Sequence, residues 1–403
     1  MKYILLMIDG ISDHPSEELG GKTPLEVSKI PHFHFLAKSG KVGSVSHIPD
    51  FLEPTASVAA VSVFGYNPKD NRIGLGPLEA MNLEIKLEAN EVAFRANLVT
   101  ESEGHLADYT GGNVSSKESR ALITYLNKKL SSDFVRFFPG SGYRHVAVLK
   151  DAEGLQGLSA RCVTPDQAVG KPIKDFLPAG KGAELLSKLM YDTKMLLDQH
   201  EINEVRVDLK ENPANMVWLW GQGIKPELAK FSDRFNGTRG AVISTDDHVK
   251  GLGRLIGLTV IDLPHDASEV EKHFEAISHS LSELLKEKDF VAIHLHGCDE
   301  ASRDGNVKRK INMLEAIDFY VLKSVRAFAE EQKDVRLLIT PLMMTPWKKK
   351  VSVREAVPFI LCGKNIVPDE IEKFSEAAAK LSTFKVRDGY RLIEFLMGQQ
   401  ETA

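Results

Sequence analysis

Short, unbroken apolar runs that alternate with longer amphipathic stretches are the feature that most constrains the fold of this 403-residue chain. The run 3–8 ends at Asp9-Gly10 and contains no polar alternation, which is typical of a strand buried on both faces. Further runs of this kind lie at 216–220, 241–244, 258–263, 290–295, 335–340 and 357–362, and helical spacing of Leu and Met lies at 183–200, 270–285 and 308–328. We therefore expect an α/β fold with a mostly parallel sheet flanked by helices.

The middle of the chain has a different pattern. Its apolar runs are shorter, and turn clusters such as 110–113 interrupt them. We interpret residues 85–180 as an inserted, smaller α+β domain, with 1–85 and 180–403 forming the core. Because ligands of an open α/β sheet bind beyond the carboxyl ends of its strands, we look for the site among the polar residues that follow the core runs.

Composition excludes several classes of partner. The chain has 51 basic and 56 acidic residues without a basic tract, so we expect no nucleic-acid partner. No apolar run approaches about 18 residues, so we expect no membrane-spanning helix and no membrane partner. The three cysteines, Cys162, Cys298 and Cys362, are far apart and form no CxxC pair, which favours a reduced, cytoplasmic protein.

Eleven short motifs, in order along nearly the whole chain, provide a more specific signal than composition. They lie at residues 9–10, 19–26, 64–68, 76–80, 93–100, 143–145, 213–221, 239–244, 250–253, 299–301 and 357–359. Together they resemble the archaeal-type, cofactor-independent phosphoglycerate mutases of the alkaline phosphatase superfamily. The resemblance implies an alkaline-phosphatase-like core and an inserted domain that caps the substrate.

The resemblance also implies a reaction. The family moves a phosphoryl group between the 2- and 3-hydroxyls of glycerate through a phosphoserine that two divalent metals (Mn, Mg, Co or Zn) hold. The metals stabilise the attacking and leaving oxygens, and the serine divides the transfer into two steps. Such chemistry requires oxygen and imidazole ligands from several strand ends.

The positions that match the family's metal ligands and nucleophile are mostly changed. Asp9 and Asp299 match metal aspartates, but the nucleophile position is Ala56, and the adjacent Ser57 could act only if its loop shifted by one residue. The other ligand positions hold Arg303, Leu342, Met343 and Ser352. A guanidinium or an apolar side chain cannot bind a metal. We therefore predict that the mutase chemistry is lost and that the protein uses no cofactor.

Residues that match the family's substrate-binding groups are better retained. By resemblance, five side chains lie near the carboxylate or phosphate of phosphoglycerate: Arg95, Arg144, His145, Asp166 and Lys250. Arginine suits these groups because its planar fork binds two oxygens at once. The alternative is that the charges merely pair with acidic neighbours at a domain interface.

A second candidate cluster follows the run at 290–295. Alternation along a strand would place His294, His296 and Cys298 on one face, where imidazole and thiolate ligands could suit zinc. The alternative is that these are buried histidines with ordinary hydrogen bonds. The run at 241–244 is followed by Asp246, Asp247 and His248. These residues could add ligands to the cluster or, more simply, cap the next helix and face solvent.

The leading functional hypothesis from the sequence is a non-catalytic member of this family. It would bind a phosphoglycerate-like anion or act as a structural or regulatory protein, as a homo-oligomer or with an active paralogue. One alternative is an enzyme with rebuilt chemistry on a phosphorylated or carboxylated small molecule. The other, ranked last, is residual phosphoglycerate mutase activity in glycolysis.

Overall fold

A computed structural model describes residues 1–151, 159–263 and 270–400, and the chain folds into two compact units. The first unit combines Met1–Arg72 with Leu228–Ala403, and the second is the continuous segment Ile73–Glu227. The second unit is thus longer at both ends than the 85–180 insertion expected from the sequence.

The limits of the second unit follow from packing on one long strand. Helix α4 (Leu75–Asn82) and strand β7 (Met216–Gly223) both contact β3 (Glu91–Ser102), and α6 (Ala183–Leu197) contacts β7. Segments before residue 85 and after residue 180 therefore belong to the same hydrophobic core as the insertion. Their helical and strand patterns resemble those of the first unit, which is why sequence alone misplaced the boundary.

The first unit is built on an eight-stranded sheet in the order β13-β2-β12-β11-β1-β10-β8-β9. Its strands are β1 (Lys2–Ile8), β2 (Gly40–Val45), β8 (Gly240–Ile243), β9 (Thr259–Ile261), β10 (Phe290–Leu295), β11 (Val335–Thr340), β12 (Val357–Gly363) and β13 (Lys385–Val386). Neighbours pair in parallel except around β12, which is antiparallel to both β11 and β2. The expected mostly parallel α/β sheet is confirmed.

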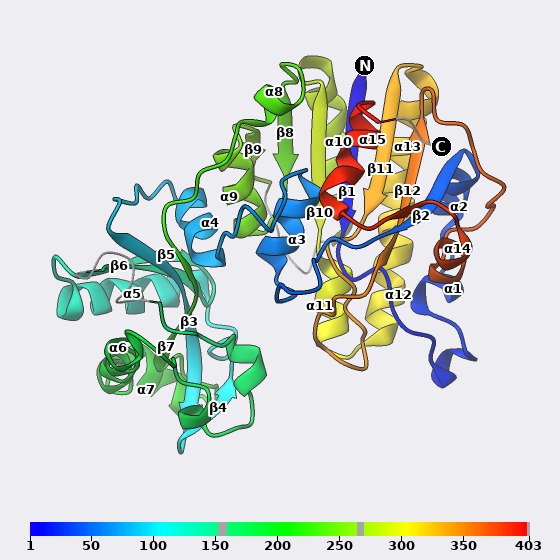
Figure 1. Ribbon diagram of the computed structural model, residues 1–403. Helices are drawn as coiled ribbons and strands as arrows, with labels where there is room; N and C mark the ends of the chain where they lie inside the picture. Colours follow the sequence, from blue (N-terminus) through cyan, green and yellow to red (C-terminus); the bar gives the residue numbers. More distant parts are fainter. Residues whose placement is uncertain (152–158, 264–269, 401–403) are drawn as a thin grey trace. The chain divides into compact units, whose positions relative to one another are not determined.

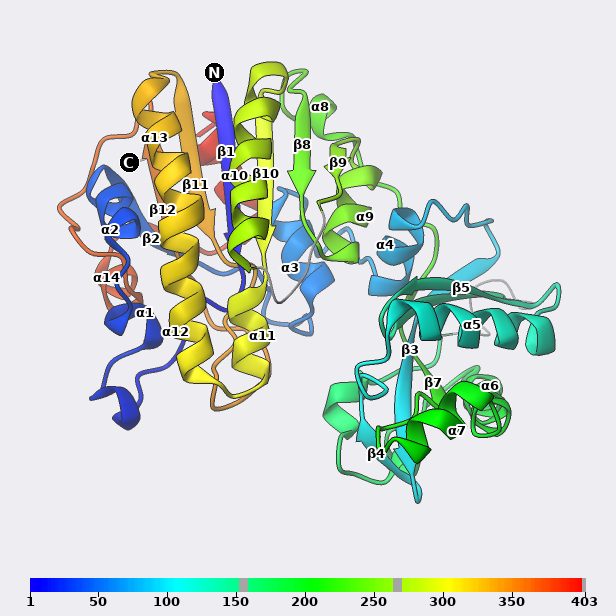
Figure 2. The ribbon, with the colours of Figure 1, turned by 180° about the vertical axis from the view of Figure 1, so that it is seen from behind.

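Helices cover both faces of this sheet (Figure 1). The helices of the first unit are α1 (Pro24–Val27), α2 (Pro31–Lys38), α3 (Ala56–Val63), α8 (Phe231–Arg234), α9 (Asp247–Leu255), α10 (Val270–Glu287), α11 (Gly297–Arg303), α12 (Val307–Ala316), α13 (Lys323–Glu331), α14 (Glu376–Leu381) and α15 (Leu392–Met397). Figure 2 shows α10, α12 and α13 over one face. Ile4, Leu6 and Ile8 of β1 belong to the core cluster beneath α10 and α13. Leu5 and Met7, on the opposite face, are also fully buried, so both faces of this strand are covered as its unbroken apolar run predicts.

The helical stretch expected at 308–328 is one continuous rod with an irregular centre. It consists of α12, a π-helical segment at Ile317–Leu322, and α13. Asp318, in the π-helical segment, accepts the backbone N–H groups of His32 and Phe33 at the start of α2. The irregular turn therefore provides an acceptor for two donors that a helix start leaves without partners. Among the described residues, no helix is long and apolar enough to cross a bilayer.

Strands β1, β8, β10 and β11 end at one edge of the sheet. The register pairs Ile8 with Leu295 and Met7 with Thr340, so the residues that follow these strands meet there. Gly10, with φ +73°, lets the chain turn against the start of α11: a Cβ at this position would lie 2.4 Å from the backbone nitrogen of Asp299. This close approach brings the loop of Asp9 next to Asp299.

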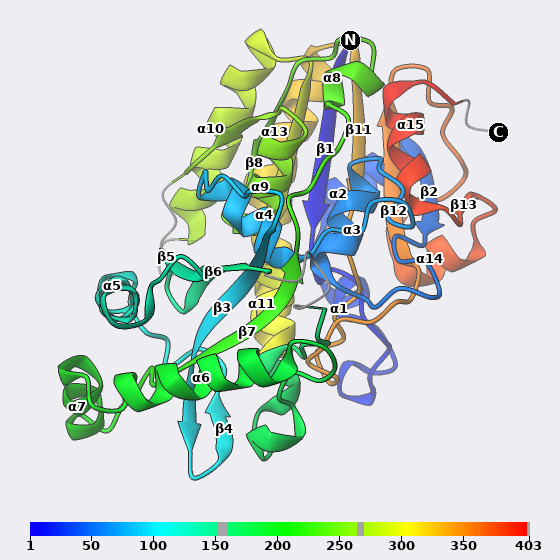
Figure 3. The same ribbon diagram turned by 60° about the vertical axis from the view of Figure 1, so that its left-hand side comes forward.

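The second unit has an antiparallel sheet in the order β4-β3-β6-β5. The fifth strand, β7, also pairs with β3, along the edge opposite β6 (Figure 3). Its remaining elements are β4 (His105–Asp108), β5 (Val135–Ser141), β6 (Arg144–Lys150), α5 (Ser116–Leu130) and α7 (Glu201–Asp208). From the sequence we grouped the apolar run 216–220 with the strands of the parallel sheet. In the structure it is part of β7 in this antiparallel sheet. Burial on both faces produces the same apolar run in either sheet, so the run did not identify its partner strands.

Candidate functional site

Asp9 is fixed by groups from two neighbouring strands. One carboxylate oxygen accepts the backbone N–H of Leu342 (2.7 Å), just after β11. The other lies 3.0 Å from Nε2 of His294 in β10, whose side chain is fully buried. Both oxygens of Asp9 are therefore engaged by protein groups at the carboxyl edge of the sheet.

Asp299, in the first turn of α11, has different partners. Arg303 lies one turn later and donates from Nε to the Asp299 carboxylate (2.7 Å), and its terminal nitrogen donates to Ser352 Oγ (2.8 Å). The hydroxyl of Thr345 donates to the other Asp299 oxygen and lies 3.1 Å from Ser352 Oγ. A permanent cation thus joins Asp299 to Ser352, two positions that the resemblance assigns to metal ligands.

The candidate nucleophile segment begins helix α3. Ala56 is the first helical residue, and Thr55 is the N-cap, accepting from the Val58 N–H. Ser57 is buried, and its hydroxyl lies 3.3 Å from that of Thr55. Among the described residues no hydrogen bond joins Ser57 to Asp9 or Asp299.

The segment after β11 lines the same edge with apolar side chains. Leu342 and Met343 are both buried. Next to them His47 is fully buried and hydrogen-bonds through Nε2 to Thr340 Oγ1 (3.0 Å). Burial lowers the pKa of His47 to about 3, so the ring is neutral at physiological pH. It acts there as a packed polar residue without charge.

The cluster expected after β10 forms with a different third member. Asp246, His294 and His296 each offer one ligand atom, and these atoms all lie within 4.8 Å of one another. Cys298 does not join them, because β10 ends at Leu295 and the chain turns into α11, which directs the thiol into the main core. Burial raises the pKa of Cys298 to about 12, which keeps it a thiol.

The residues at the start of α9 do not face solvent as the simpler interpretation held. Asp246 takes the N-cap position of α9 but makes no side-chain cap hydrogen bond. Its carboxylate instead accepts from Nδ1 of His248 (2.8 Å), whose side chain is only 5% exposed. Asp247 forms an ion pair with Lys250 (3.1 Å).

The second unit arranges three of the expected anion-binding residues on a β-sheet. Cross-strand partners share a face, and β3 pairs Asn97 with Arg144 and Ala96 with His145. Arg95 and Arg144 therefore project from one face, whereas His145 projects from the other. His145 is buried there, and burial lowers its pKa to about 3 despite an opposing hydrogen bond to Gly142.

Several of these charges have acidic partners. Arg95 Nε lies 2.9 Å from Glu79, and its guanidinium lies 5.0 Å from the centre of the Trp220 ring. Burial would lower the pKa of Lys250, but the carboxylates of Asp247 and Asp262 outweigh it and raise that pKa. These ion pairs fit the alternative in which the charges stabilise the fold.

Asp166 lies in a short 3₁₀ turn at Pro165–Ala168 and is half-buried. It belongs to the second unit with Arg95, Arg144 and His145, whereas Lys250 belongs to the first. The five residues that the resemblance groups around one anion are therefore divided between the two units.

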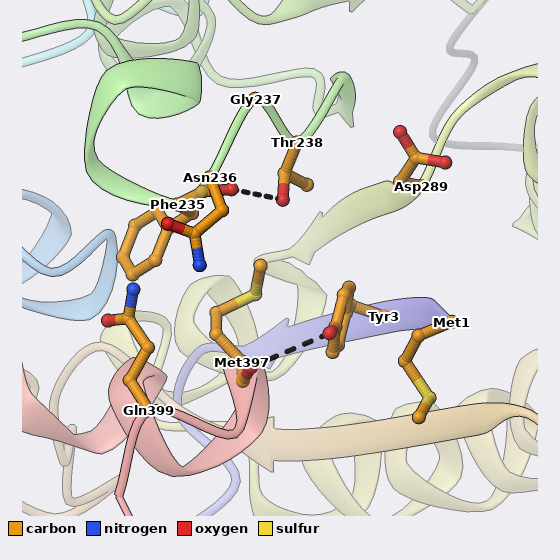
Figure 4. A pocket seen from close by; sticks show the side chains of 9 residues that line it. All are labelled: Met1, Tyr3, Phe235, Asn236, Gly237, Thr238, Asp289, Met397 and Gln399. Atoms are coloured by element: carbon orange, nitrogen blue, oxygen red, sulfur yellow. Dashed lines mark hydrogen bonds between the residues drawn. The ribbon is translucent and has the colours of Figure 1, made fainter.

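A cavity of about 290 Å³ lies at the opposite edge of the parallel sheet (Figure 4). It is lined by Tyr3 at the amino end of β1, by Asp289 just before β10 and by Met397 of α15. Because the cavity lies at the amino ends of β1 and β10, it is separate from Asp9 and Asp299, which follow the carboxyl ends of the same strands. Ligands of such sheets bind beyond the carboxyl ends.

Three hydroxyl groups that contact Asp299, His294 or His296 were not singled out from the sequence. Thr345 bonds Asp299, Ser244 lies 3.0 Å from Nδ1 of His294, and Thr245 lies 3.3 Å from Nδ1 of His296. Ser244 and Thr245 directly follow β8. Their place at the carboxyl end of the apolar run 241–244 was the signal that could have identified them.

The chain matches known proteins along nearly its whole length. A family model described as 2,3-bisphosphoglycerate-independent phosphoglycerate mutase matches residues 37–203. A probable 2,3-bisphosphoglycerate-independent phosphoglycerate mutase of Geobacter sulfurreducens is 36% identical over 402 residues, covering 98% of this chain and 100% of the relative. The 2,3-bisphosphoglycerate-independent phosphoglycerate mutase of Methanosarcina acetivorans is 35% identical over 382 residues, covering 94% and 95%.

Solved structures show the same fold. The PH0037 protein of Pyrococcus horikoshii has a TM-score of 0.79 at 24% identity, covering 100% of this chain and 99% of that one. A cofactor-independent phosphoglycerate mutase of Thermoplasma acidophilum has a TM-score of 0.61 at 22% identity, covering 99% and 100%.

These relatives correct one expectation from the sequence. We expected no cofactor, but the relatives that match along the whole chain are phosphoglycerate mutases of the class that the resemblance links to divalent metals. The expectation that the protein uses no metal, which we drew from the changed ligand positions, is therefore wrong. Which residues of this chain suit a metal is a separate question of geometry.

Proposed function

Although the chain belongs to the 2,3-bisphosphoglycerate-independent phosphoglycerate mutase family, we propose that it has lost the phosphomutase reaction and acts as a non-catalytic protein that binds a phosphorylated anion. The proposal concerns the reaction at the Asp9/Asp299 edge, where the family's nucleophile and ligands are expected.

The observation that supports this proposal most directly is the position of Arg303. Its guanidinium contacts both Asp299 (2.7 Å) and Ser352 (2.8 Å). A dication at this place would meet a fixed positive charge within hydrogen-bonding distance of its remaining carboxylate. The guanidinium itself has no lone pair to donate to a metal. Three of the family's ligand positions are thus taken up by the Arg303–Asp299 ion pair and by the Ser352 hydroxyl to which Arg303 donates.

The other positions do not form a two-metal donor set either. Asp9 has both oxygens engaged, and the residues next to it, Leu342 and Met343, are buried and apolar. Ala56 at the start of α3 has no atom that could carry a phosphoryl group. Removing the nucleophile alone from such a coupled set costs on the order of a millionfold in turnover.

Anion binding is proposed for the second unit. Arg95 and Arg144 project from one face of the sheet, and the charge of Arg95 is balanced by Glu79. Arg95 is also buried, so Arg144 is the residue whose fork is proposed to reach the phosphate or carboxylate. It is half-buried, and its guanidinium lies 5.5 Å from the ring of Tyr143, which orients it.

Two alternatives have observations in their favour. Identity of 34–36% over the full length with named mutases favours residual mutase activity. The cluster of Asp246, His294 and His296 favours rebuilt chemistry. Both predict turnover of a phosphorylated or carboxylated substrate, which the non-catalytic proposal excludes for phosphoglycerate.

The test is an assay of 3-phosphoglycerate to 2-phosphoglycerate conversion with added Mn²⁺ or Co²⁺, beside the Geobacter sulfurreducens relative. We expect turnover at least about a millionfold below the relative, from the loss of the nucleophile alone. Metal-dependent turnover within about a hundredfold of the relative would refute the loss of mutase chemistry, and its disappearance in Ser57→Ala would then identify the nucleophile.

Anion binding is measured separately by calorimetric titration with 3-phosphoglycerate. We expect saturable binding that Arg144→Ala weakens at least about tenfold, because a charge-assisted, two-pronged contact contributes about 1.5–3 kcal/mol. Arg120→Ala, an exposed arginine of α5 in the same unit, is the matched control and should bind normally. Equal binding by both variants, or none by the wild type, would refute the anion site.

A further inference from the structure

The carboxyl ends of β8 and β10 bring together three side chains that the family resemblance does not assign to any metal. These are Asp246, His294 and His296, with ligand atoms all within 4.8 Å of one another. From this geometry we infer that they bind a single divalent ion of the zinc class. The inference goes beyond the proposed function and does not depend on it.

Carboxylates fix which nitrogen of each imidazole is available. Nε2 of His294 lies 3.0 Å from Asp9, and Nε2 of His296 lies 3.1 Å from Glu300. Ionised carboxylates only accept hydrogen bonds, so each Nε2 carries the proton and each Nδ1 has the lone pair. A metal-binding histidine commonly donates its other N–H to a carboxylate, which orients the ring and makes it more basic.

Both Nδ1 atoms point to the segment that bears the third ligand. Nδ1 of His294 lies 3.0 Å from Ser244 Oγ, and that oxygen also accepts the backbone N–H of Asp246 (2.9 Å). Nδ1 of His296 lies 3.3 Å from the hydroxyl of Thr245. The lone pairs of the two rings therefore converge on residues 244–246, where the Asp246 carboxylate begins.

His248 packs beside the same cluster. Its Nδ1 lies 2.8 Å from Asp246, its ring centre lies 6.2 Å from that of His294, and its side chain is 5% exposed. Its Nε2 is buried and has no hydrogen-bond partner among the residues that the structure describes. A buried polar nitrogen left in this way is costly, and such groups mark places where a ligand or ordered water belongs.

The donor set selects the metal. Two imidazoles and one carboxylate suit zinc and its neighbours, whereas Mg²⁺ and Ca²⁺ prefer oxygen ligands only. Three protein ligands leave one tetrahedral position for water or an anionic oxygen. Tetrahedral ligands of zinc lie about 3.3 Å apart, so the atoms now within 4.8 Å of one another would have to close by up to about 1.5 Å.

The competing interpretation is a hydrogen-bonded network that needs no ion. In that case the Ser244 and Thr245 hydroxyls satisfy the two Nδ1 atoms permanently. At the two Nδ1 atoms the ion would displace these neutral contacts, of which the one to His296 is already long at 3.3 Å. Metal coordination is stronger than either contact, and the carboxylate contacts of both Nε2 atoms stay intact.

The test uses the full chain, treated with a chelator, dialysed, and titrated with Zn²⁺. We expect one Zn²⁺ per chain by calorimetry and elemental analysis, and an intense visible spectrum typical of tetrahedral coordination with Co²⁺. Asp246→Asn and His296→Asn should each weaken Zn²⁺ binding by at least about tenfold. Urea unfolding of the metal-free variants shows whether each one folds, and if His296→Asn does not, Asp246→Asn decides.

Two control variants separate this site from other metal binding. Asp299→Asn alters the position retained from the family, and His14→Asn alters an exposed His–Glu pair elsewhere, His14 with Glu355 (2.9 Å). Both should bind Zn²⁺ like the wild type. Absence of stoichiometric binding would overturn the inference, and so would binding that Asp299→Asn abolishes while His296→Asn leaves it unchanged.

Discussion

Replacing Glu376 by glutamine should make the protein more stable at alkaline pH. Glu376, in the first turn of α14, accepts the Asp13 backbone N–H (2.9 Å) and the Thr23 hydroxyl (2.8 Å). Burial, with a further contribution from Glu26, raises its pKa from 4.5 to about 7. The folded protein therefore keeps a proton on this carboxyl that the unfolded chain has already released at neutral pH.

The sign and size of the effect follow from linkage. Between pH 4.5 and 7 the native state binds the proton and the unfolded state does not, so stability falls as pH rises through this window. One pH unit corresponds to about 1.4 kcal/mol, so the wild type loses about 3 kcal/mol by pH 8.5. Glutamine cannot ionise, and its amide retains an oxygen for the Asp13 N–H, so Glu376→Gln avoids this loss.

The measurement is urea unfolding of wild type and Glu376→Gln at pH 5.0 and pH 8.5. We expect the variant to gain about 2–3 kcal/mol over the wild type between these two conditions. Glu372→Gln is the matched control, because Glu372 is exposed and pairs with Lys38 (3.0 Å). That surface pair contributes at most about 1 kcal/mol, and its loss should not favour the alkaline condition.

A difference between wild type and Glu376→Gln that does not change with pH would refute this reasoning. It would mean that Glu376 is already ionised in the native protein at neutral pH. A variant that is less stable than the wild type at both pH values, but by a smaller margin at pH 8.5, would support the raised pKa and show that glutamine does not reproduce the hydrogen bonds of Glu376.

Two further changes test the packing that supports the site. Lys310 is fully buried, forms an ion pair with Asp13 and donates to Thr345 O (3.2 Å). Lys310→Met should therefore lower the free energy of unfolding in urea by about 3–5 kcal/mol, and adding Asp13→Asn should recover part of that loss. A loss below about 1 kcal/mol would contradict the buried pair. Gly10→Ala should lower the free energy of unfolding by at least about 2 kcal/mol, because alanine at φ +73° is strained and its Cβ would overlap the Asp299 backbone. An unchanged melting temperature would contradict that close approach.

The core strands were the most predictable part of the structure. The runs at 290–295 and 335–340 match β10 and β11 residue for residue, because strands buried on both faces are mostly apolar, even with a polar residue such as His294 or Arg336 inside the run. The direction of β12 was not predictable, since an antiparallel strand in the middle of a sheet has the same apolar run. Strand direction depends on the route of the connections, which local sequence does not encode.

The candidate site was predictable by position more than by contact. Sequence identified Asp9, Asp299 and the changed residues such as Arg303, but not that Arg303 would join Asp299 to Ser352. Alternation along β10 failed beyond Leu295, because the strand ends there and Cys298 turns into the core with α11. A period of two holds only while the backbone stays extended.

The sequence by itself determined the family, the core strands and which chemical groups follow them, because periodic burial and residue identity are local properties of the chain. Only the tertiary structure decided that Asp246, not Cys298, lies with His294 and His296. The parallel pairing of β1, β10 and β8 brings together loops that lie as far apart in the chain as residues 9, 246 and 296. Such a meeting depends on strand order and register, which are set when the whole sheet assembles.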